Sequence, residues 1–207
     1  MIDELRIYRL VPGGLADYLR LAEEVAVPVR GDRFGTLLGF WHGEVGAVNS
    51  VFNLWQHTDL NGRQALREQL EQLESWRSDY LPHVRPLMQQ QEIRLMTQVL
   101  PLRPPIGVGH VYEFRIVRTR PGHAQAVAEA LANGPDATFL DQTVALWTTF
   151  AGRLNEVVHL SAWSDARSRL AASLQSPAWQ ALLRKTGPLI DEIESSLTLP
   201  ARHSPWQ

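Results

Sequence analysis

NSVFNLWQHTD, residues Asn49 to Asp59, returns later in the chain as NEVVHLSAWSD, residues Asn155 to Asp165. Each copy alternates apolar side chains with polar or aromatic ones, which is the pattern of a β-strand that has one face against a core. The sequence therefore predicts that the same strand is built twice. Whatever the protein binds is expected to meet the second, polar and aromatic face.

The repeat extends well beyond this strand. Glu113 to Gly122 repeats Glu4 to Gly13, and both copies contain Glu-x-Arg-Ile and end in Pro-Gly. Trp147 likewise repeats Trp41. A repeat of roughly 100 residues is too long for a solenoid unit and long enough to fold as a domain. We therefore expect two related domains in tandem.

The order of elements within each copy predicts the fold class. In the first copy, strands are expected near 4–10, 36–42, 49–58 and 92–99, with amphipathic helices after Leu15 and after Asp59. This β-α-β-β-α-β order is the ferredoxin-like arrangement, an α+β fold in which two helices cover one face of a four-stranded antiparallel sheet. The expected boundaries are a domain at 1–100, a Pro/Gly linker at 101–110, a second domain at 111–200 and a frayed tail at 201–207.

Composition excludes several classes of function. The 207 residues are 44% hydrophobic with a net charge of −2 and scattered basic residues, so neither a nucleic acid nor a membrane surface is expected as partner. The chain contains no cysteine, which excludes disulfides and thiolate chemistry. It shows no signal or transit peptide pattern and no apolar run of membrane-spanning length, so a cytoplasmic location is expected.

Motifs for common cofactors are missing. The sequence has no phosphate-binding loop, no dinucleotide fingerprint and no Gly-x-Ser-x-Gly elbow. It also lacks the closely spaced His and carboxylate patterns of metal sites. No metal is therefore expected, and haem is the one cofactor left open.

The alternation also assigns side chains to the two faces of each sheet. The apolar set is expected to meet the helices: Leu5, Ile7, Leu38, Phe40, Phe52 and Leu54, and in the second copy Phe114, Ile116, Val144, Leu146, Val158, Leu160 and Ala162. The other face is expected to carry Glu4, Arg6, Tyr8, Trp41, Asn53 and Trp55, with Glu113, Arg115, Trp147, His159, Ser161 and Trp163 in the second copy. His57, at a strand end, is expected to face solvent. Two sheets that share their polar faces would bury a chamber between them.

Two groups of residues resemble the NIPSNAP family. They are the paired Glu-x-Arg strand that ends in Pro-Gly, and the run from Leu37 to Trp41 that continues through Gly46, Asn49 and Leu54-Trp55 to Asp59-Leu60. The resemblance covers residues 3–100 and, more weakly, 111–199. It implies the dimeric α/β-barrel superfamily, in which two ferredoxin-like units press their sheets together. Members of that superfamily include cofactor-independent monooxygenases, haem-using enzymes and small-molecule binders, so fold alone does not select a function.

The two copies depart from the family pattern at different places. The family's usual His in the Val-Val-His-Leu-Trp run is present as His159 but is Asn53 in the first copy. The Trp of that run is kept as Trp55 but is Ser161 in the second copy. The two copies are therefore not expected to perform the same chemistry.

Each candidate site residue has a structural interpretation and at least one functional interpretation. The Glu4–Arg6 and Glu113–Arg115 pairs would either form buried salt bridges or let the Arg hold a ligand oxygen. His159 would be a packed core residue, a general base or an axial haem ligand. The catalytic candidates are His159 and Arg115, and the candidates for substrate binding are Glu4, Arg6, Tyr8, Trp41, Asn53, Trp55, Glu113, Trp147 and Trp163.

The expected function is to bind a small apolar or aromatic organic molecule, with cofactor-independent oxygenation or proton transfer as the enzymatic form. A non-catalytic protein-interaction scaffold and a haem-binding protein are the alternatives. The sequence leaves open whether the two domains pair within one chain or between the chains of a homo-oligomer.

Overall fold

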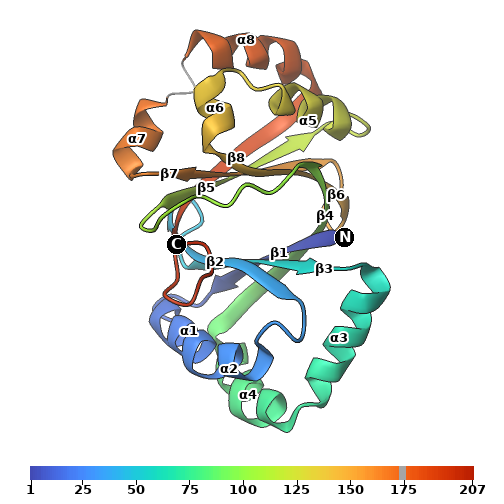
Figure 1. Ribbon diagram of the computed structural model, residues 1–207, viewed down its shortest axis with the longest axis vertical. Coiled ribbons are helices and arrows are strands. Elements are labelled where there is room, and N and C mark those ends of the chain that lie inside the picture. Colours follow the sequence, from blue (N-terminus) through green and yellow to red (C-terminus); the bar gives the residue numbers. More distant parts are fainter. Residues whose placement is uncertain (173–175) are drawn as a thin grey trace. The chain divides into compact units, whose positions relative to one another are not determined.

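The computed structural model describes residues 1–172 and 176–207. It contains two compact units: unit 1 comprises Met1–Leu95 with Pro200–Gln207, and unit 2 comprises Met96–Leu199. In each unit the helices lie on one face of a four-stranded sheet (Figure 1). The strand order is β4-β1-β3-β2 in unit 1 and β8-β5-β7-β6 in unit 2, as expected for a ferredoxin-like unit.

Unit 1 contains four strands and two interrupted helical segments. The strands are β1 (Ile2–Leu10), β2 (Thr36–Val45), β3 (Ser50–His57) and β4 (Met88–Leu100). The first segment is α1 (Leu15–Leu21), a π-helical turn (Ala22–Ala26) and α2 (Val27–Arg30). The second is α3 (Leu60–Gln72), a π-helical turn (Trp76–Tyr80), α4 (Leu81–Val84) and a 3-10 turn (Arg85–Leu87). Asp59 caps α3 by accepting from the backbone N–H of Gly62.

Unit 2 follows the same plan with different helices. Its strands are β5 (Val111–Thr119), β6 (Thr143–Ala151), β7 (Glu156–Trp163) and β8 (Ile190–Pro200). Its helices are α5 (Ala124–Ala132), α6 (Ala137–Gln142), α7 (Ala166–Ala171) and α8 (Pro177–Thr186), followed by a 3-10 turn (Gly187–Leu189). None of the helices described in unit 2 contains a π-turn.

The repeated Asn residues have a backbone role. Asn49 and Asn155 both adopt the left-handed conformation, with φ of 53° and 61°. Asn tolerates this conformation better than other residues with a side chain, apart from Asp. Their carbonyls accept hydrogen bonds from Leu10 and Thr119 at 2.7 and 2.8 Å. Each Asn therefore ties the turn before the third strand of its unit to the end of the first strand.

The predicted orientation of β1 and β3 is wrong. Arg63 on α3 donates to Glu4 at 2.6 Å, and the ring of Tyr8 packs on Tyr18 of α1 with centroids 6.4 Å apart. Because Glu4 and Tyr8 face the helices, Leu5 and its cross-strand partner Leu54 lie on the opposite face of the sheet. Both faces of the strand are buried, so alternation reveals two faces but does not say which one meets the helices.

The same correction applies to β5 and β7 of unit 2. Arg169 on α7 donates to Glu113, and the ring of Phe139 on α6 stacks on His159. Phe114 and Leu160, which pair across the strands, therefore lie on the face away from the helices. The assignments in the second strand of each unit are partly confirmed, because Phe40 and Leu146 do pack among helix residues.

The end of the chain is packed and not frayed. Ala201 donates its backbone N–H to the carbonyl of Phe40 at 2.8 Å, and Ser204 Oγ accepts from the N–H of Phe40 at 2.9 Å. The ring of His203 lies 4.6 Å from that of Phe40. Residues 201–207 thus form part of unit 1.

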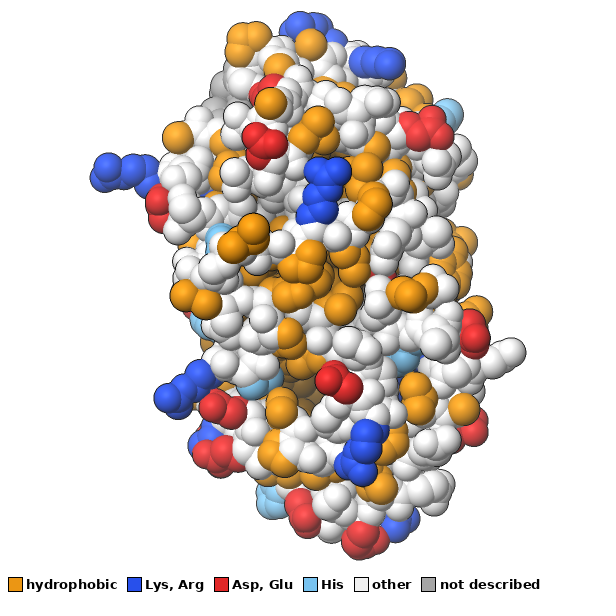
Figure 2. Space-filling view, in the orientation of Figure 1, with side chains coloured by type: hydrophobic (Ala, Val, Ile, Leu, Met, Phe, Trp, Pro, Cys, Tyr) orange, Lys and Arg blue, Asp and Glu red, His pale blue; other side chains and the backbone are white. Residues whose placement is uncertain are grey.

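Charge is mixed on the surface. Acidic and basic side chains are interspersed on the face shown in Figure 2, in line with a net charge of −2. Among the described residues, no helix has both the length and the apolar composition needed to cross a membrane.

Candidate functional site

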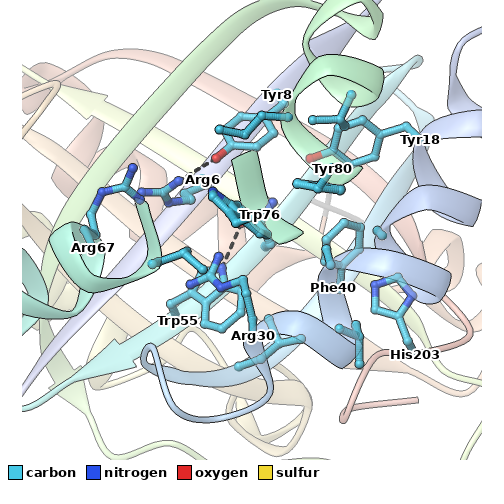
Figure 3. A pocket seen from close by; sticks show the side chains of 18 of the residues that line it. Arg6, Tyr8, Tyr18, Arg30, Phe40, Trp55, Arg67, Trp76, Tyr80 and His203 are labelled. Carbon is cyan, nitrogen blue, oxygen red and sulfur yellow. Dashed lines mark hydrogen bonds between the residues drawn. The ribbon is translucent and has the colours of Figure 1, made fainter. Parts of the chain in front are cut away.

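A cavity of about 700 Å³ lies between the sheet and the helices of unit 1. Volumes of this size are typical of sites for small organic molecules. The sheet contributes Arg6, Tyr8, Asn53 and Trp55 to its wall, all four of which were predicted as binding residues. Figure 3 shows how the helices close the cavity with aromatic and basic side chains: Tyr18, Arg30, Arg67, Trp76 and Tyr80, together with Phe40 of β2 and His203 from the C-terminal segment.

Both π-helical turns of unit 1 border this cavity. Ala22 and Ala26 lie in the first turn, and Trp76 and Tyr80 lie in the second. A π-turn inserts one residue into the helical ladder and often occurs at functional sites. The first turn thus contributes two small side chains to the lining of the cavity, and the second contributes two large aromatic ones.

Glu4 anchors one end of the polar wall. It accepts hydrogen bonds from Arg6 Nε at 2.5 Å and from Arg63 Nε at 2.6 Å. His57 Nε2 lies 3.4 Å from the same carboxylate and is buried, so the expectation that His57 faces solvent is wrong. Burial alone would raise the pKa of Glu4, but the hydrogen bonds with His57 and Arg63 and the charge of Arg6 hold it far below its usual range. Glu4 is therefore ionised at all ordinary pH values.

Arg6 connects this carboxylate to the cavity. While its Nε is bonded to Glu4, its Nη1 donates to the hydroxyl of Tyr8 at 2.7 Å. The Tyr8 hydroxyl can still donate its own proton, because an O–H group accepts and donates at once. Tyr8 thus presents a polarised hydroxyl group at the cavity wall.

Arg30 lies between two indole rings. Its guanidinium carbon is 3.6 Å from the centroid of the Trp55 ring and 5.7 Å from that of Trp76, within cation–π range in both cases. Trp55 is itself fixed by donating Nε1–H to Asn53 Oδ1 at 2.9 Å. Arg30 Nη2 donates to the carbonyl of Phe34 at 3.1 Å, while Arg30 Nε is buried without a hydrogen-bond partner among the described residues.

Unit 2 repeats the ion pair. Glu113 accepts from Arg115 at 2.9 Å and from Arg169 at 2.5 Å, and Ser195 donates to it as well. Burial alone would raise the pKa of Glu113, yet the hydrogen bonds from Arg169 and Ser195 and the charge of Arg115 lower it to about 2. Since the arrangement of one carboxylate with two guanidinium groups occurs in both units, its first role is structural.

The space under the helices differs between the units. In unit 2 the Trp179 ring lies 4.9 Å from the Arg115 guanidinium, and the Phe139 ring is stacked 4.5 Å from that of His159. These rings leave a smaller cavity of about 440 Å³, lined in its described part by Arg115, Phe139, Trp163 and Trp179 among others. Trp163 donates Nε1–H to Ser161 Oγ at 3.0 Å.

His159 is a packed residue. Its Nε2 lies 2.9 Å from Thr143 Oγ1, whose single proton is donated to the carbonyl of Phe139 at 2.7 Å. The hydroxyl therefore accepts from His159, which places the imidazole proton on Nε2. Burial, reinforced by the charge of Arg115, lowers the pKa of His159 to about 3, so the ring is neutral at pH 7.

This environment does not fit the predicted roles of His159. The ring is 1% exposed and is absent from the described lining of both cavities. A haem iron would need a ring nitrogen with open space in front of it. Nε2 is bonded to Thr143, Nδ1 has no hydrogen-bond partner among the described residues but is fully buried, and one face of the ring is covered by Phe139. We therefore derive no step through haem.

The remaining predicted residues lie elsewhere. Trp41 and Trp147 are fully buried on the sheet faces away from the helices, as predicted for their orientation, and neither appears among the described residues of the cavities. Sequence reasoning missed Arg30, Arg67, Trp76, Tyr80 and His203. One signal was available: Tyr18, Ala22, Ala26 and Arg30 recur every four residues and form one stripe of the first helical segment.

Both halves of the chain are similar to proteins of one family. The sequence profile of the NIPSNAP family matches residues 3–101 and again residues 112–205. The chain is 27% identical to human Protein NipSnap homolog 2, over 99% of this chain and 74% of that protein. It is 23% identical to the Protein NipSnap homolog of Dictyostelium discoideum, over 97% of this chain and 88% of the relative.

Solved structures resemble it at the level of the fold. A candidate monooxygenase from Fusobacterium nucleatum superposes with a TM-score of 0.69 at 11% identity, covering 97% of this chain and 92% of that one. An anthrone oxidase-like protein superposes with a TM-score of 0.67 at 15% identity, covering 100% and 94%. These likenesses confirm the predicted fold class, tandem ferredoxin-like units of the dimeric α/β-barrel type. Two successive family matches that together cover most of the chain identify it as a tandem member of the NIPSNAP family.

Proposed function

We propose that the cavity of unit 1 binds a small organic molecule with a flat, largely apolar body. The observation that carries this proposal is a cavity of about 700 Å³ whose wall combines the rings of Tyr18, Trp55 and Trp76 with several guanidinium groups. Apolar and aromatic walls with a few placed polar groups are typical of such sites. The unit 2 cavity is smaller and partly filled by Trp179, so unit 1 is the site we assign.

Calorimetric titration with two naphthalene probes, 2-naphthoate and 2-naphthamide, tests this proposal. We expect saturable binding of one molecule per chain for at least one of them. Trp76→Ala should weaken that binding about fivefold, since an aromatic contact contributes roughly 1 kcal/mol. Phe150→Ala, which changes an exposed ring in unit 2, is the matched control and should bind normally. The absence of saturable binding by both probes would refute the proposal.

A second candidate, proton transfer at a carbon next to a carbonyl, is favoured by His203. This side chain lines the cavity, and its Nε2 is buried without a hydrogen-bond partner among the described residues. Burial lowers the pKa of His203, so the imidazole is neutral and able to accept a proton at pH 7. The proton would pass from the carbon to Nε2 and return, while the enolate oxygen accepts a hydrogen bond from Tyr8 or Arg30.

Deuterium exchange measures this reaction without knowledge of the natural substrate. The α-protons of 2-tetralone would exchange in D₂O faster with the protein than in buffer, as followed by proton NMR. His203→Gln should remove the acceleration, while His83→Gln, an exposed histidine outside the described cavity lining, should retain it. Equal rates with the parent protein and His203→Gln would eliminate this candidate.

A further inference from the structure

The charges around the unit 1 cavity are unequal in sign. The basic residues of its lining are Arg6, Arg30, Arg67, Arg77 and Arg85, and the acidic ones are Asp32 and Glu71. Glu4, the buried carboxylate nearby, already accepts from both Arg6 and Arg63. Glu71 is exposed and lies 3.7 Å from Arg67. The deeper part of the cavity therefore carries more positive charge than its own carboxylates neutralise.

Arg30 is a half-buried cation whose Nε is fully buried, and it has no carboxylate partner among the described residues. Within the described part of the chain its one hydrogen bond is the donation of Nη2 to the carbonyl of Phe34, and no ion pair is formed. A buried guanidinium group normally requires a partner, because the loss of hydration costs several kcal/mol. The rings of Trp55 and Trp76 hold its plane in place and replace only part of that hydration. Among the described residues no group accepts a hydrogen bond from its Nε–H.

The positive charge of neighbouring Arg residues further disfavours the charged form of Arg30. Burial and the nearby positive charge of Arg6 lower its pKa to about 10. The pKa of Arg67 is also lowered, by burial and by the positive charge of Arg6. An anion placed among these three groups would relieve their mutual repulsion.

The described cations of unit 2 that lie over indole rings have a carboxylate partner. Arg115 lies over Trp179 and Arg169 over Trp163, and both pair with Glu113. At the position that matches Arg30, unit 2 has the apolar ring of Phe139, which stacks on His159. The cation is therefore a feature of the unit with the large cavity and not of the shared scaffold.

Resting on the proposed function, we propose that this cavity takes its ligand as an anion, an aromatic ring bearing a carboxylate or phenolate, and that Arg30 binds the negative oxygen. The guanidinium plane is already oriented by the two indoles, so its terminal amino groups are held in place to donate to a ligand oxygen in the cavity. The ring of the ligand would extend toward Tyr18, Phe40 and Tyr80, which form the apolar part of the wall. Figure 3 shows these rings across the cavity from Arg30 and Arg67.

The test compares two probes of equal shape and different charge. We expect 2-naphthoate to bind the unaltered protein at least tenfold more tightly than 2-naphthamide in calorimetric titrations at pH 7, because a hydrogen bond to a charged group contributes about 1.5 kcal/mol or more. Arg30→Met should lower the affinity for naphthoate about tenfold and leave that for naphthamide unchanged. Arg30→Lys, which keeps the charge but not the planar guanidinium group, should give an intermediate loss.

The control lies on the same helical segment. Arg20→Met removes an exposed Arg that pairs with Asp17 and Glu24, and it should change neither affinity. Equal binding of both probes, or an equal loss of both in Arg30→Met, would overturn the anion site while leaving the proposed function intact. Failure of both probes to bind would remove the proposed function as well. The ratio of the two affinities in the unaltered protein decides the question even if a variant does not fold.

Discussion

Arg30 and Glu113 are two charged residues beneath the helices that differ in the number of their partners. Glu113 is fully surrounded by donors from Arg115, Arg169 and Ser195. Arg30 has aromatic neighbours and a single backbone acceptor. A saturated carboxylate holds the fold together, whereas an unsaturated guanidinium group is available to a ligand. The number of hydrogen-bond and ion-pair partners thus distinguishes a charged group with a structural role from one that can bind a ligand.

Glu113→Gln should destabilise unit 2 strongly. The change leaves Arg115 and Arg169 without their carboxylate, and breaking a buried pair in this way costs about 3 kcal/mol or more. Glu192→Gln is the matched control, because Glu192 pairs with Arg118 at the surface and such pairs contribute about 0–1 kcal/mol. Urea unfolding of both variants measures the difference. Equal stabilities would show that the buried cluster is not structural.

His159 should make the protein sensitive to acid. Its pKa is about 3 in the folded chain and 6.5 without burial, so both states are neutral at pH 7. Between these values the unfolded chain binds a proton that the folded chain does not, and stability falls as pH is lowered, by about 1.4 kcal/mol per pH unit from this group. His159→Asn, which copies Asn53, should flatten the loss between pH 6.5 and 4.5.

The His159→Asn experiment has a matched control and a result that would contradict the prediction. His83→Asn changes an exposed histidine and should leave the slope of stability against pH as it is. If His159→Asn has the same slope as the parent protein in thermal unfolding across this range, the ring is not buried in its neutral form.

At the scale of elements, the helices decide whether a cavity exists. Both helical segments of unit 1 contain a π-turn at the cavity. The described helices of unit 2 contain no π-turn. Ala22 of the first π-turn matches Leu131 of α5 when the Glu-x-Arg strands are aligned. Unit 2 places a larger, buried side chain there. The same scaffold is thus open in one unit and filled in the other.

Ala22→Leu should close the unit 1 cavity. The added methyl groups enter existing space, so binding of both naphthalene probes should fall by more than tenfold without loss of thermal stability. Ala65→Leu, on the exposed side of α3, is the control and should bind normally. A variant that folds and still binds both probes with unchanged affinity would place the ligand elsewhere.

The sequence predicted the elements much better than the faces. Repeated motifs such as Glu-x-Arg-Ile and the Asn turns gave the order of strands and helices, because these depend on local periodicity. Which face of a strand meets the helices depends on the side chains that the helices present to it. In β1 the charged side chains Glu4 and Arg6 meet α3 and the cavity, contrary to the usual preference for an apolar sheet–helix interface.

The part of the candidate site that lies on the strands was predicted, because it depends on the alternation of side chains along each strand. Arg6, Tyr8, Asn53 and Trp55 do share one wall, since alternate residues of neighbouring strands point the same way. The spacing of four residues indicates only that Arg30 shares a helix face with Tyr18, and its position over Trp55 also depends on the π-turn between them. His203 could not be placed, because it lies in a segment that returns from the far end of the chain.

At the scale of the whole molecule, duplication has kept the framework and changed the contents. Each unit retains the β-α-β-β-α-β order and the carboxylate with two guanidinium groups. The C-terminal residues 201–207 belong to unit 1, so the wall of the cavity is completed by the last part of the chain. A fragment that lacks these residues would have an incomplete site.

Truncation after Pro200 should therefore affect unit 1 alone. It removes the two hydrogen bonds to Phe40 and the contact with His203, together about 2 kcal/mol. The melting temperature of unit 1 should fall by roughly 10 °C, and naphthoate affinity should fall as the cavity opens. Arg202→Ala, in the same segment but exposed, is the control. Unchanged melting and affinity would show that the segment is dispensable.

The position of a bound ligand shows whether the cavity of unit 1 is an anion-binding site. A crystal of the protein grown with 6-bromo-2-naphthoate would locate the bromine by its anomalous scattering. We predict one bromine peak beneath the helices of unit 1, against the apolar wall formed by Tyr18, Phe40 and Tyr80, with the carboxylate of the probe within hydrogen-bond distance of Arg30. A bromine peak at any other place, or an empty cavity in crystals grown at saturating probe, would contradict the account.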